Sequence, residues 1–228
     1  MSKYILLWLE GPLQSWGYDS QFGMRDTLAF PTKSGVFGII LAALGAKGPQ
    51  IDLLQVLSEY PQSVISYKKR EDKESFLMDF QMVGSGYNDK DIWEKNFIPK
   101  TNDGKKAIGG GTKMTYRNYL QDAVFAVIQE LPDSLAIDIA AALQAPVFNL
   151  SLGRKNCIPS EFIFQGIFSE KDESENSAQK LSEEKGLIKD FYVLDGEYPG
   201  DLITLNDVPL QFGEMKKYRD RRVSVIEC

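Results

Sequence analysis

The 228-residue sequence contains no histidine. This absence excludes Ser-His-Asp and Cys-His nucleophile systems, histidine-ligated metal centres and the usual general base of metal-independent ribonucleases. Any catalysis would have to use lysine, tyrosine, aspartate or glutamate side chains.

Cysteine and long apolar segments are also scarce. The two cysteines, Cys157 and Cys228, are too few for a disulfide framework or a cysteine-ligated zinc site, so we expect a reducing cytoplasm. The apolar run from Tyr4 to Leu9 is far shorter than the ~20 residues that span a bilayer, and it lacks the flanking features of an export signal. We therefore expect a protein without membrane segments, metal site or cofactor.

Charge is present in both signs, and the two signs are segregated along the chain. The formal net charge is −6, from 26 basic and 32 acidic residues. Residues 100–118 and residues 216–222 each contain five basic residues and one acidic residue, whereas residues 169–185 contain six acidic and three basic residues. Net charge describes the long-range field and not one face, so nucleic acid stays open as a partner. Taken alone, the basic blocks are also compatible with ordinary solvated surface.

The apolar periodicity predicts six regular elements in the first 168 residues. Strands are expected at 4–10, 63–70, 122–130 and 161–168, and helices at 34–44, capped by Thr32 or Ser34, and at 134–145. This order is that of the split βαβ unit in ferredoxin-like and RNA-recognition folds. The sequence therefore predicts an α+β domain of that type over residues 1–168.

Two further regions complete the predicted organisation. Residues 71–121 form an insertion that is too long for a connector and that contains a strand-like run at 76–83 and the glycines 109–111. Residues 169–228 contain an acidic helix-like stretch and three short strand candidates, at 191–197, 202–205 and 222–226. We expect the latter to form a small C-terminal β-sheet separate from the main domain.

Three loops carry the candidate binding residues. Residues 31–35, PTKSG, open the first helix, where unpaired amides and the helix dipole favour phosphate; the alternative is an ordinary helix cap. Residues 14–17, QSWG, follow the first strand, and their indole and amide suit base stacking and base-edge contacts; the alternative is a core anchor. Residues 109–117, GGGTKMTYR, join flexible backbone to cations and a ring; the alternative is a basic surface hairpin.

These residues also carry a family resemblance. The opening YILLWLEGPLQSWG, followed by FPTKSGVFGIILAALG from residue 30, resembles the CasD family of CRISPR-associated proteins, subtype I-E. The segments TYRNYLQDAVFAV, SLGRKNCIPS and DVPLQFGEMKKYRDRRVSV agree with the same family in the same order. The resemblance covers nearly the whole chain and is weakest at residues 89–106 and 169–187.

The resemblance implies both a fold and a role. The expected fold is an RNA-recognition-type domain with a protruding β-hairpin, the thumb, within residues 71–121. The expected role is that of a non-catalytic, cytoplasmic Cascade subunit that holds the five-prime handle of CRISPR RNA and contacts the CasC backbone subunit and the large CasA subunit. The lack of histidine agrees with a branch of the family that does not cut RNA.

Under this hypothesis the candidate residues take specific roles. Those expected to hold phosphates through amides and charge are Thr32, Lys33, Ser34 and Gly35. Those expected beside splayed bases are Gln14, Trp16 and Gly17. Those expected to neutralise phosphate or touch nucleotides at the thumb are Arg25, Lys113, Thr115, Tyr116 and Arg117, with Arg154 as a further candidate.

Two alternatives remain open at this point. One is a metal-independent endoribonuclease that processes CRISPR repeat RNA with Tyr116 and Lys113 and no imidazole. The other is a structural adaptor whose neighbours alone touch the RNA.

Overall fold

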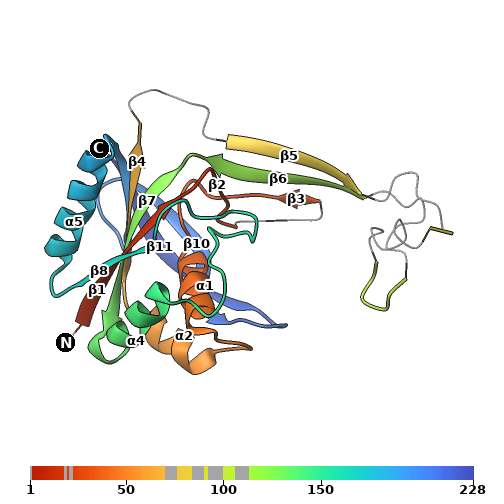
Figure 1. Cartoon of the computed structure of the whole chain (residues 1–228), viewed down its shortest axis with the longest axis horizontal. Helices are drawn as coiled ribbons and strands as arrows, with labels where there is room; N and C mark the ends of the chain where they lie inside the picture. Colours follow the sequence, from red (N-terminus) through yellow and green to blue (C-terminus); the bar gives the residue numbers. More distant parts are fainter. Residues whose placement is uncertain are drawn as a thin grey trace.

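The computed structural model describes residues 2–17, 20, 23–69, 76–83, 90–91, 100–105 and 113–228. It has a mixed α/β fold built on two sheets. The larger sheet has seven strands in the order β10-β11-β9-β4-β7-β1-β8, and neighbouring strands run antiparallel (Figure 1). The strands are β1 (Ser2–Glu10), β4 (Gln62–Lys68), β7 (Val124–Pro132), β8 (Phe164–Phe168), β9 (Ile188–Asp195), β10 (Asp201–Gln211) and β11 (Lys217–Glu227).

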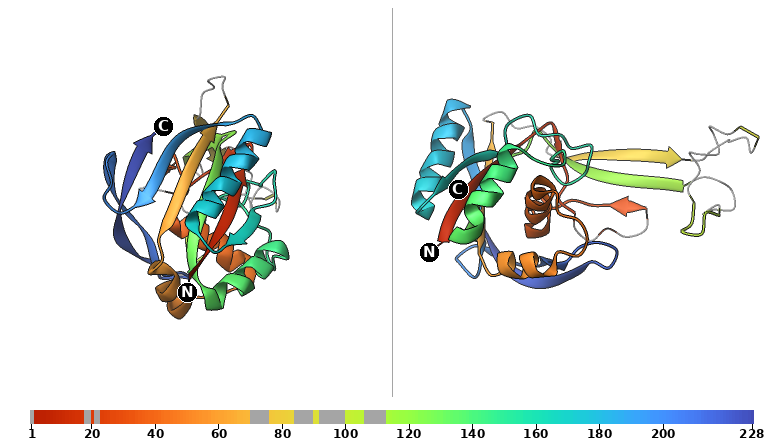
Figure 2. Two further views of the ribbon diagram at one scale, coloured as in Figure 1. Left: turned by 90° about the vertical axis from the view of Figure 1, so that its left-hand side faces the viewer. Right: turned by 60° about the horizontal axis from the view of Figure 1, so that its bottom comes forward.

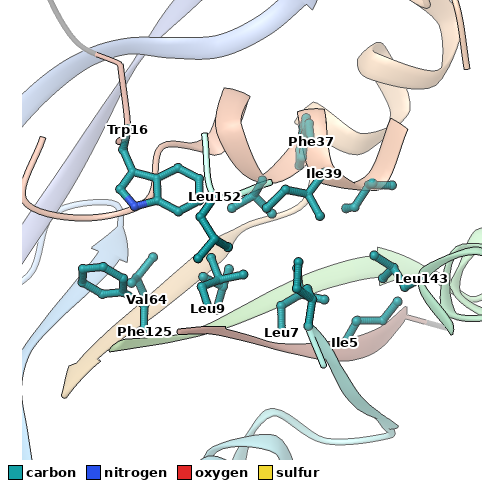
Figure 3. Packing of buried hydrophobic residues seen from close by; sticks show 14 of the residues in the cluster. Ile5, Leu7, Leu9, Trp16, Phe37, Ile39, Val64, Phe125, Leu143 and Leu152 are labelled. Carbon is teal, nitrogen blue, oxygen red and sulfur yellow. The ribbon is translucent and has the colours of Figure 1, made fainter. Parts of the chain in front are cut away.

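Alternation along β1 divides the interior into two apolar layers. Ile5, Leu7 and Leu9 face the main core, shared with helices α1 (Lys33–Leu44), α2 (Ile51–Ser58) and α4 (Asp133–Gln144), as Figure 3 shows for part of this core. The intervening Leu6 and Trp8 face the other side, where α5 (Lys171–Glu184) covers the sheet. A strand with apolar residues on both faces is buried on both, which is why β1 reads as a continuous apolar run.

A second sheet forms a hairpin that projects from the body (Figures 1 and 2). Strands β5 (Phe76–Val83) and β6 (Lys113–Gln121) pair antiparallel over their whole length, and the short β2 (Leu13–Gln14) and β3 (Met24–Arg25) flank β6. Only Asp122 and Ala123 separate β6 from β7, and Asp122 has a φ of 48°. The hairpin is therefore an outgrowth of the inner strand β7.

The expected small C-terminal sheet is wrong. Strand β9 pairs with β4, and β11 and β10 follow it, so all three C-terminal strands extend the main sheet across the predicted boundary at residue 168. Strands β10 and β11 are eleven residues long, whereas short strands were expected, because charged and polar residues on their exposed face hide the alternation. Helix α2 was not predicted either. No helix in the described ranges is long and apolar enough to cross a membrane.

Candidate nucleic-acid interface

Gln14 and Trp16 lie inside the molecule, at the joint between the hairpin and the main sheet. The Gln14 amide nitrogen donates to the carbonyl oxygens of Leu9, at 3.0 Å, and Ala123, at 2.6 Å, and Trp16 Nε1 donates to Gln14 Oε1 at 3.1 Å. Both side chains are fully buried. Their positions match the alternative of a core anchor, and their contact with splayed bases stays a prediction; Gly17, next in the chain, is exposed.

The first turn of α1 is capped from within the protein. Thr32 Oγ1 accepts a hydrogen bond from the Gly35 amide at 3.1 Å, and the Lys33 amide donates to Asp207 Oδ2 at 2.7 Å. A Cβ at Gly35 would lie 2.7 Å from the Trp16 ring, so glycine is needed for this close packing. Since a carboxylate already occupies the positive end of the helix dipole, this end of α1 is not a free phosphate site.

Lys33 itself is buried, with 3% of its surface exposed. Its ammonium lies 3.2 Å from Asp195 Oδ2 and donates to the Tyr60 carbonyl oxygen at 2.7 Å. Burial lowers the pKa of Lys33, and the attraction of Asp195 offsets this only in part. The structure thus gives the Lys33 ammonium partners within its own chain, and its contact with RNA phosphate stays a prediction.

A second cation, Arg221, lies beside Lys33 and Asp195. In the sequence it belongs to the basic block at residues 216–222. Its Nε and Nη2 donate to the two carboxylate oxygens of Asp207, both at 2.7 Å, and its Nη1 contacts Asp195. Burial on its own lowers the pKa of Arg221, but the carboxylates of Asp207 and Asp195 reverse this effect and raise the pKa above its ordinary value. The ion pairs of Arg221 therefore connect β11 to β10 and β9, and through Asp207 and Asp195 to α1.

A hollow of about 520 Å³ lies between the first turn of α1 and strands β10 and β11. Ser34 reaches it and is half-buried, with its hydroxyl 3.3 Å from Thr32 Oγ1. Gly17 lines the same hollow, and its other walls include Asp207 and Asp220. One of these carboxylates, Asp207, is paired with Arg221, and the other, Asp220, accepts a hydrogen bond from the Asn206 side chain.

Three arginines gather at the base of the hairpin. Arg25 and Arg117 are register partners in the parallel pair β3–β6, so their side chains leave the same face of the small sheet. Arg154 reaches them from the loop after α4: its Nη2 donates to the Arg25 carbonyl oxygen at 2.8 Å and its Nη1 to the Asn118 carbonyl oxygen at 3.0 Å. Among the described residues, no ion pair joins the Arg25 or the Arg117 guanidinium to a carboxylate, although Asp79 is the register partner of Arg117 in β5 and lies on the same face. The three guanidinium groups therefore form a basic cluster.

The ring of Tyr119 supports this basic cluster. The guanidinium carbon of Arg154 lies 4.6 Å from the centroid of the Tyr119 ring, and Asn156 donates to the Tyr119 hydroxyl at 3.1 Å. Tyr119 lies two residues after Arg117 and hence on the same face of β6. These interactions fix Arg154, which the sequence could place only as a further candidate.

Replacing Gly153 with alanine should displace the loop that carries Arg154. Gly153 has a φ of 89°, and an added Cβ would lie 1.7 Å from the Ser15 carbonyl oxygen. We expect Gly153→Ala to lower the free energy of unfolding by about 1–3 kcal/mol, measured by urea denaturation. Gly48→Ala is the matched control, because its φ is also positive, at 81°, but its Cβ would meet nothing within 4 Å. Equal destabilisation of the two variants would contradict this account of the loop.

The remaining thumb candidates lie on both faces of the hairpin. Thr115 shares the face of Arg117, whereas Tyr116 lies on the opposite face beside Met24. Lys113 begins β6, ~13 Å along the strand from Arg117. Residues 109–112 lie outside the described residues, and of Lys113 only the backbone is described. The structure thus brings together Arg25, Arg117 and Arg154, and it places Trp16 beside Gly35. It does not gather all three predicted loops into one surface.

The fold and the basic cluster define an α/β protein whose projecting hairpin presents cations at its root, an arrangement suited to an anionic partner. The family model described as CRISPR-associated protein (Cas_Cas5) matches residues 4–224, and the chain belongs to this family.

Individual relatives agree with this assignment. The CRISPR system Cascade subunit CasD of Escherichia coli strain K12 is 31% identical over 175 residues, which cover 75% of this chain and 74% of that protein. A chain of a solved CRISPR RNA-guided surveillance complex is similar with a TM-score of 0.71 and 28% identity, over 98% of this chain and 89% of that one. A crystal structure of a Cas protein shares the fold, with a TM-score of 0.55 and 24% identity over 99% and 93% of the two chains.

Proposed function

We propose that the chain is a non-catalytic subunit of a Cascade-type CRISPR surveillance complex and that it binds the five-prime handle of the CRISPR RNA. The observation that carries this proposal is the basic cluster of Arg25, Arg117 and Arg154 at the base of a projecting hairpin. Guanidinium groups bind phosphate oxygens in a bidentate geometry, which suits a sharply turned RNA backbone. Family membership and the similarity to CasD supply the context.

The roles within this site differ from the sequence hypothesis. Arg25 and Arg117 bind phosphates directly, and Arg154 contributes charge from a fixed position above Tyr119. Thr115 lies on the same face as a neutral neighbour, and Lys113, at the start of β6, is kept as a further phosphate contact. Trp16 and the first turn of α1 support this surface from behind and do not touch RNA.

The proposal includes a fold description and partners. Strands β4, β7, β1 and β8 lie side by side and antiparallel, with helices between β1 and β4 and between β7 and β8, which is the arrangement of a ferredoxin-like core. The partners are CasC and CasA subunits of the same cytoplasmic complex, as the family resemblance implies. Among the described residues, the Tyr116 hydroxyl has no acid or base as hydrogen-bond partner, so the ribonuclease alternative is not favoured.

Binding of handle RNA by the assembled complex tests this function. Complexes are purified with and without this chain and titrated with CRISPR RNA that carries either the natural handle or a shuffled handle of the same length. We expect at least tenfold tighter binding of the natural handle, and only in the complex that contains this chain. Equal binding of the two RNAs would contradict the proposal, and an RNA product cut at the handle boundary by the isolated chain would support the ribonuclease alternative.

A further inference from the structure

A hollow at the edge of the seven-stranded sheet shares no residue with the basic cluster. It has a volume of about 460 Å³ and is lined by side chains of β1, α4, α5 and β8 and of the loop before β8. Strand β8 is an edge strand of the sheet, and both α4 and α5 contact it (Figure 2). We call this space the edge hollow. Its volume lies within the ~300–1,000 Å³ of sites that bind small organic molecules.

Apolar side chains from both sides of the sheet form most of the walls of the edge hollow. Trp8 and Leu181 belong to the layer under α5, whereas Leu143 and Phe164 belong to the main core. The two layers meet here because no further strand follows β8. The ring of Phe162 also lines the hollow, although 88% of this residue is exposed. Such walls accommodate the apolar stem of a ligand, and an exposed aromatic ring can lie over a cation.

The charged groups of the edge hollow have an excess of negative charge. The Lys185 ammonium lies 2.7 Å from Glu161 Oε1 and 3.0 Å from Glu10 Oε2. Trp8 Nε1 donates to the same Glu10 oxygen at 2.7 Å, so this carboxylate is held directly behind the indole. Of the residues that line the hollow, Lys185 alone is a cation. Two carboxylates against one ammonium leave a formal charge of −1, which favours a positively charged ligand.

The hydrogen-bonding groups of the edge hollow point to the same kind of ligand. Each side-chain donor group in its walls is already engaged within the chain: the amide nitrogens of Gln144 and Gln165 donate to backbone carbonyl oxygens, and Lys185 and Trp8 donate to carboxylates. Within the described part of the chain, no donor reaches Glu161 Oε2 or the amide oxygens of Gln144 and Gln165. A ligand that offers several N–H donors therefore matches these acceptors.

We propose that the edge hollow binds an organic cation, namely a guanidinium or ammonium group on an apolar stem. The stem packs against Leu143 and Phe164, and the cationic head donates to Glu161 and to the glutamine amide oxygens. A free alkylguanidine or alkylamine offers this chemistry, and so does an arginine or lysine side chain of a neighbouring protein; the experiment below separates the two sources. The inference goes beyond the proposed function, because binding at this site does not depend on RNA.

Titration of the full-length chain with butylguanidinium tests this assignment, with butylurea as the neutral control of the same shape. The chain is labelled with 5-fluorotryptophan, so that its fluorine NMR spectrum reports on Trp8 in the wall of the hollow and on Trp16 outside it. We expect the Trp8 signal to move with a Kd of about 1 mM, which is usual for a ligand of about eight heavy atoms. Butylurea should bind at least about tenfold more weakly, and the Trp16 signal should stay in place.

Two substitutions in the walls should change the affinity in opposite directions. Glu161→Gln removes a negative charge and should weaken binding of butylguanidinium about fivefold or more, whereas Gln144→Glu adds one and should strengthen it about threefold or more. Both side chains are exposed, so neither change should disturb the fold. Glu59→Gln is the matched control, because it makes the same change in net charge at an exposed residue next to α2, outside the hollow. Its affinity should equal that of the unmodified chain.

Three outcomes would overturn the inference: a Trp8 signal that does not move, equal binding of butylguanidinium and butylurea, or equal affinities of the Glu161→Gln and Gln144→Glu variants. Where the isolated chain binds as expected, the same titration in the assembled complex identifies the source of the cation. Unchanged affinity there supports a site for a free cation. Loss of the response there supports a side chain of a neighbouring protein that already fills the hollow. Failure of the chain to enter a complex with RNA would count against the proposed function alone.

Discussion

Replacing Arg25 and Arg117 together with glutamine is expected to weaken binding of handle RNA about 30-fold, since each ion pair between a guanidinium and a phosphate at a partly solvated site contributes about 1 kcal/mol. The slope of log affinity against log salt should become shallower by about 0.7 for each phosphate that is no longer neutralised. The measurement is a filter-binding titration at several salt concentrations. Neither side chain forms an ion pair with a carboxylate among the described residues, so the stability of the folded state should change little.

The control for this variant has the same change in net charge at the other end of the molecule. Lys171 and Lys180 lie on α5, far from the hairpin (Figure 1). Lys171→Gln with Lys180→Gln should change RNA affinity less than twofold. If the two double variants bind RNA equally well, the basic cluster is not the RNA site.

The second large effect is expected at Arg221. Replacing it with methionine leaves the buried Asp207 carboxylate without its cation, whereas Asp195 keeps Lys33, and breaking a buried ion pair in this way costs about 3–5 kcal/mol. The free energy of unfolding from urea denaturation measures this destabilisation.

Lys33→Met is the informative comparison within the same cluster. Without the ammonium, Asp195 keeps Arg221 and the Gln62 amide as partners, and the Tyr60 carbonyl keeps the Gln129 side chain at 3.5 Å. We therefore expect a destabilisation of about 1 kcal/mol and unchanged affinity for handle RNA. A large fall in RNA affinity at unchanged stability would restore Lys33 as a phosphate ligand, and a destabilisation equal to that of Arg221→Met would contradict the unequal roles.

The sequence predicted the helices and strands whose apolar residues recur with a clear period. It missed the features that depend on pairing between strands far apart in the sequence. The apolar runs that became β1, β7 and α1 stand out because they are buried on most sides. The C-terminal strands were expected to form a separate sheet because nothing local in their sequence specifies that β9 pairs with the open edge of β4. Register and neighbour choice come from the assembled core, which periodicity does not reveal.

The candidate site was predicted unevenly for a similar reason. Arg25, Arg117 and Arg154 were all among the predicted residues, yet their meeting depends on a parallel pairing of two residues and on a turn at Gly153. The ion pair of Lys33 was missed because its partner Asp195 lies 162 residues away. A lysine in a helix-capping motif looks the same in sequence whether it meets phosphate or a carboxylate of its own chain.

The short joint between β6 and β7 has a mechanical consequence. Asp122 and Ala123 leave no room for a hinge, and the Gln14 amide ties the Ala123 carbonyl to that of Leu9 in β1. The hairpin is therefore a cantilever with its fixed end in the middle of the sheet. Its deflection under a load grows with distance from Gln121. Arg117 is four residues from that end, so it keeps a nearly constant distance from Arg25 and Arg154. More distant parts of β5 and β6 follow the bound partner.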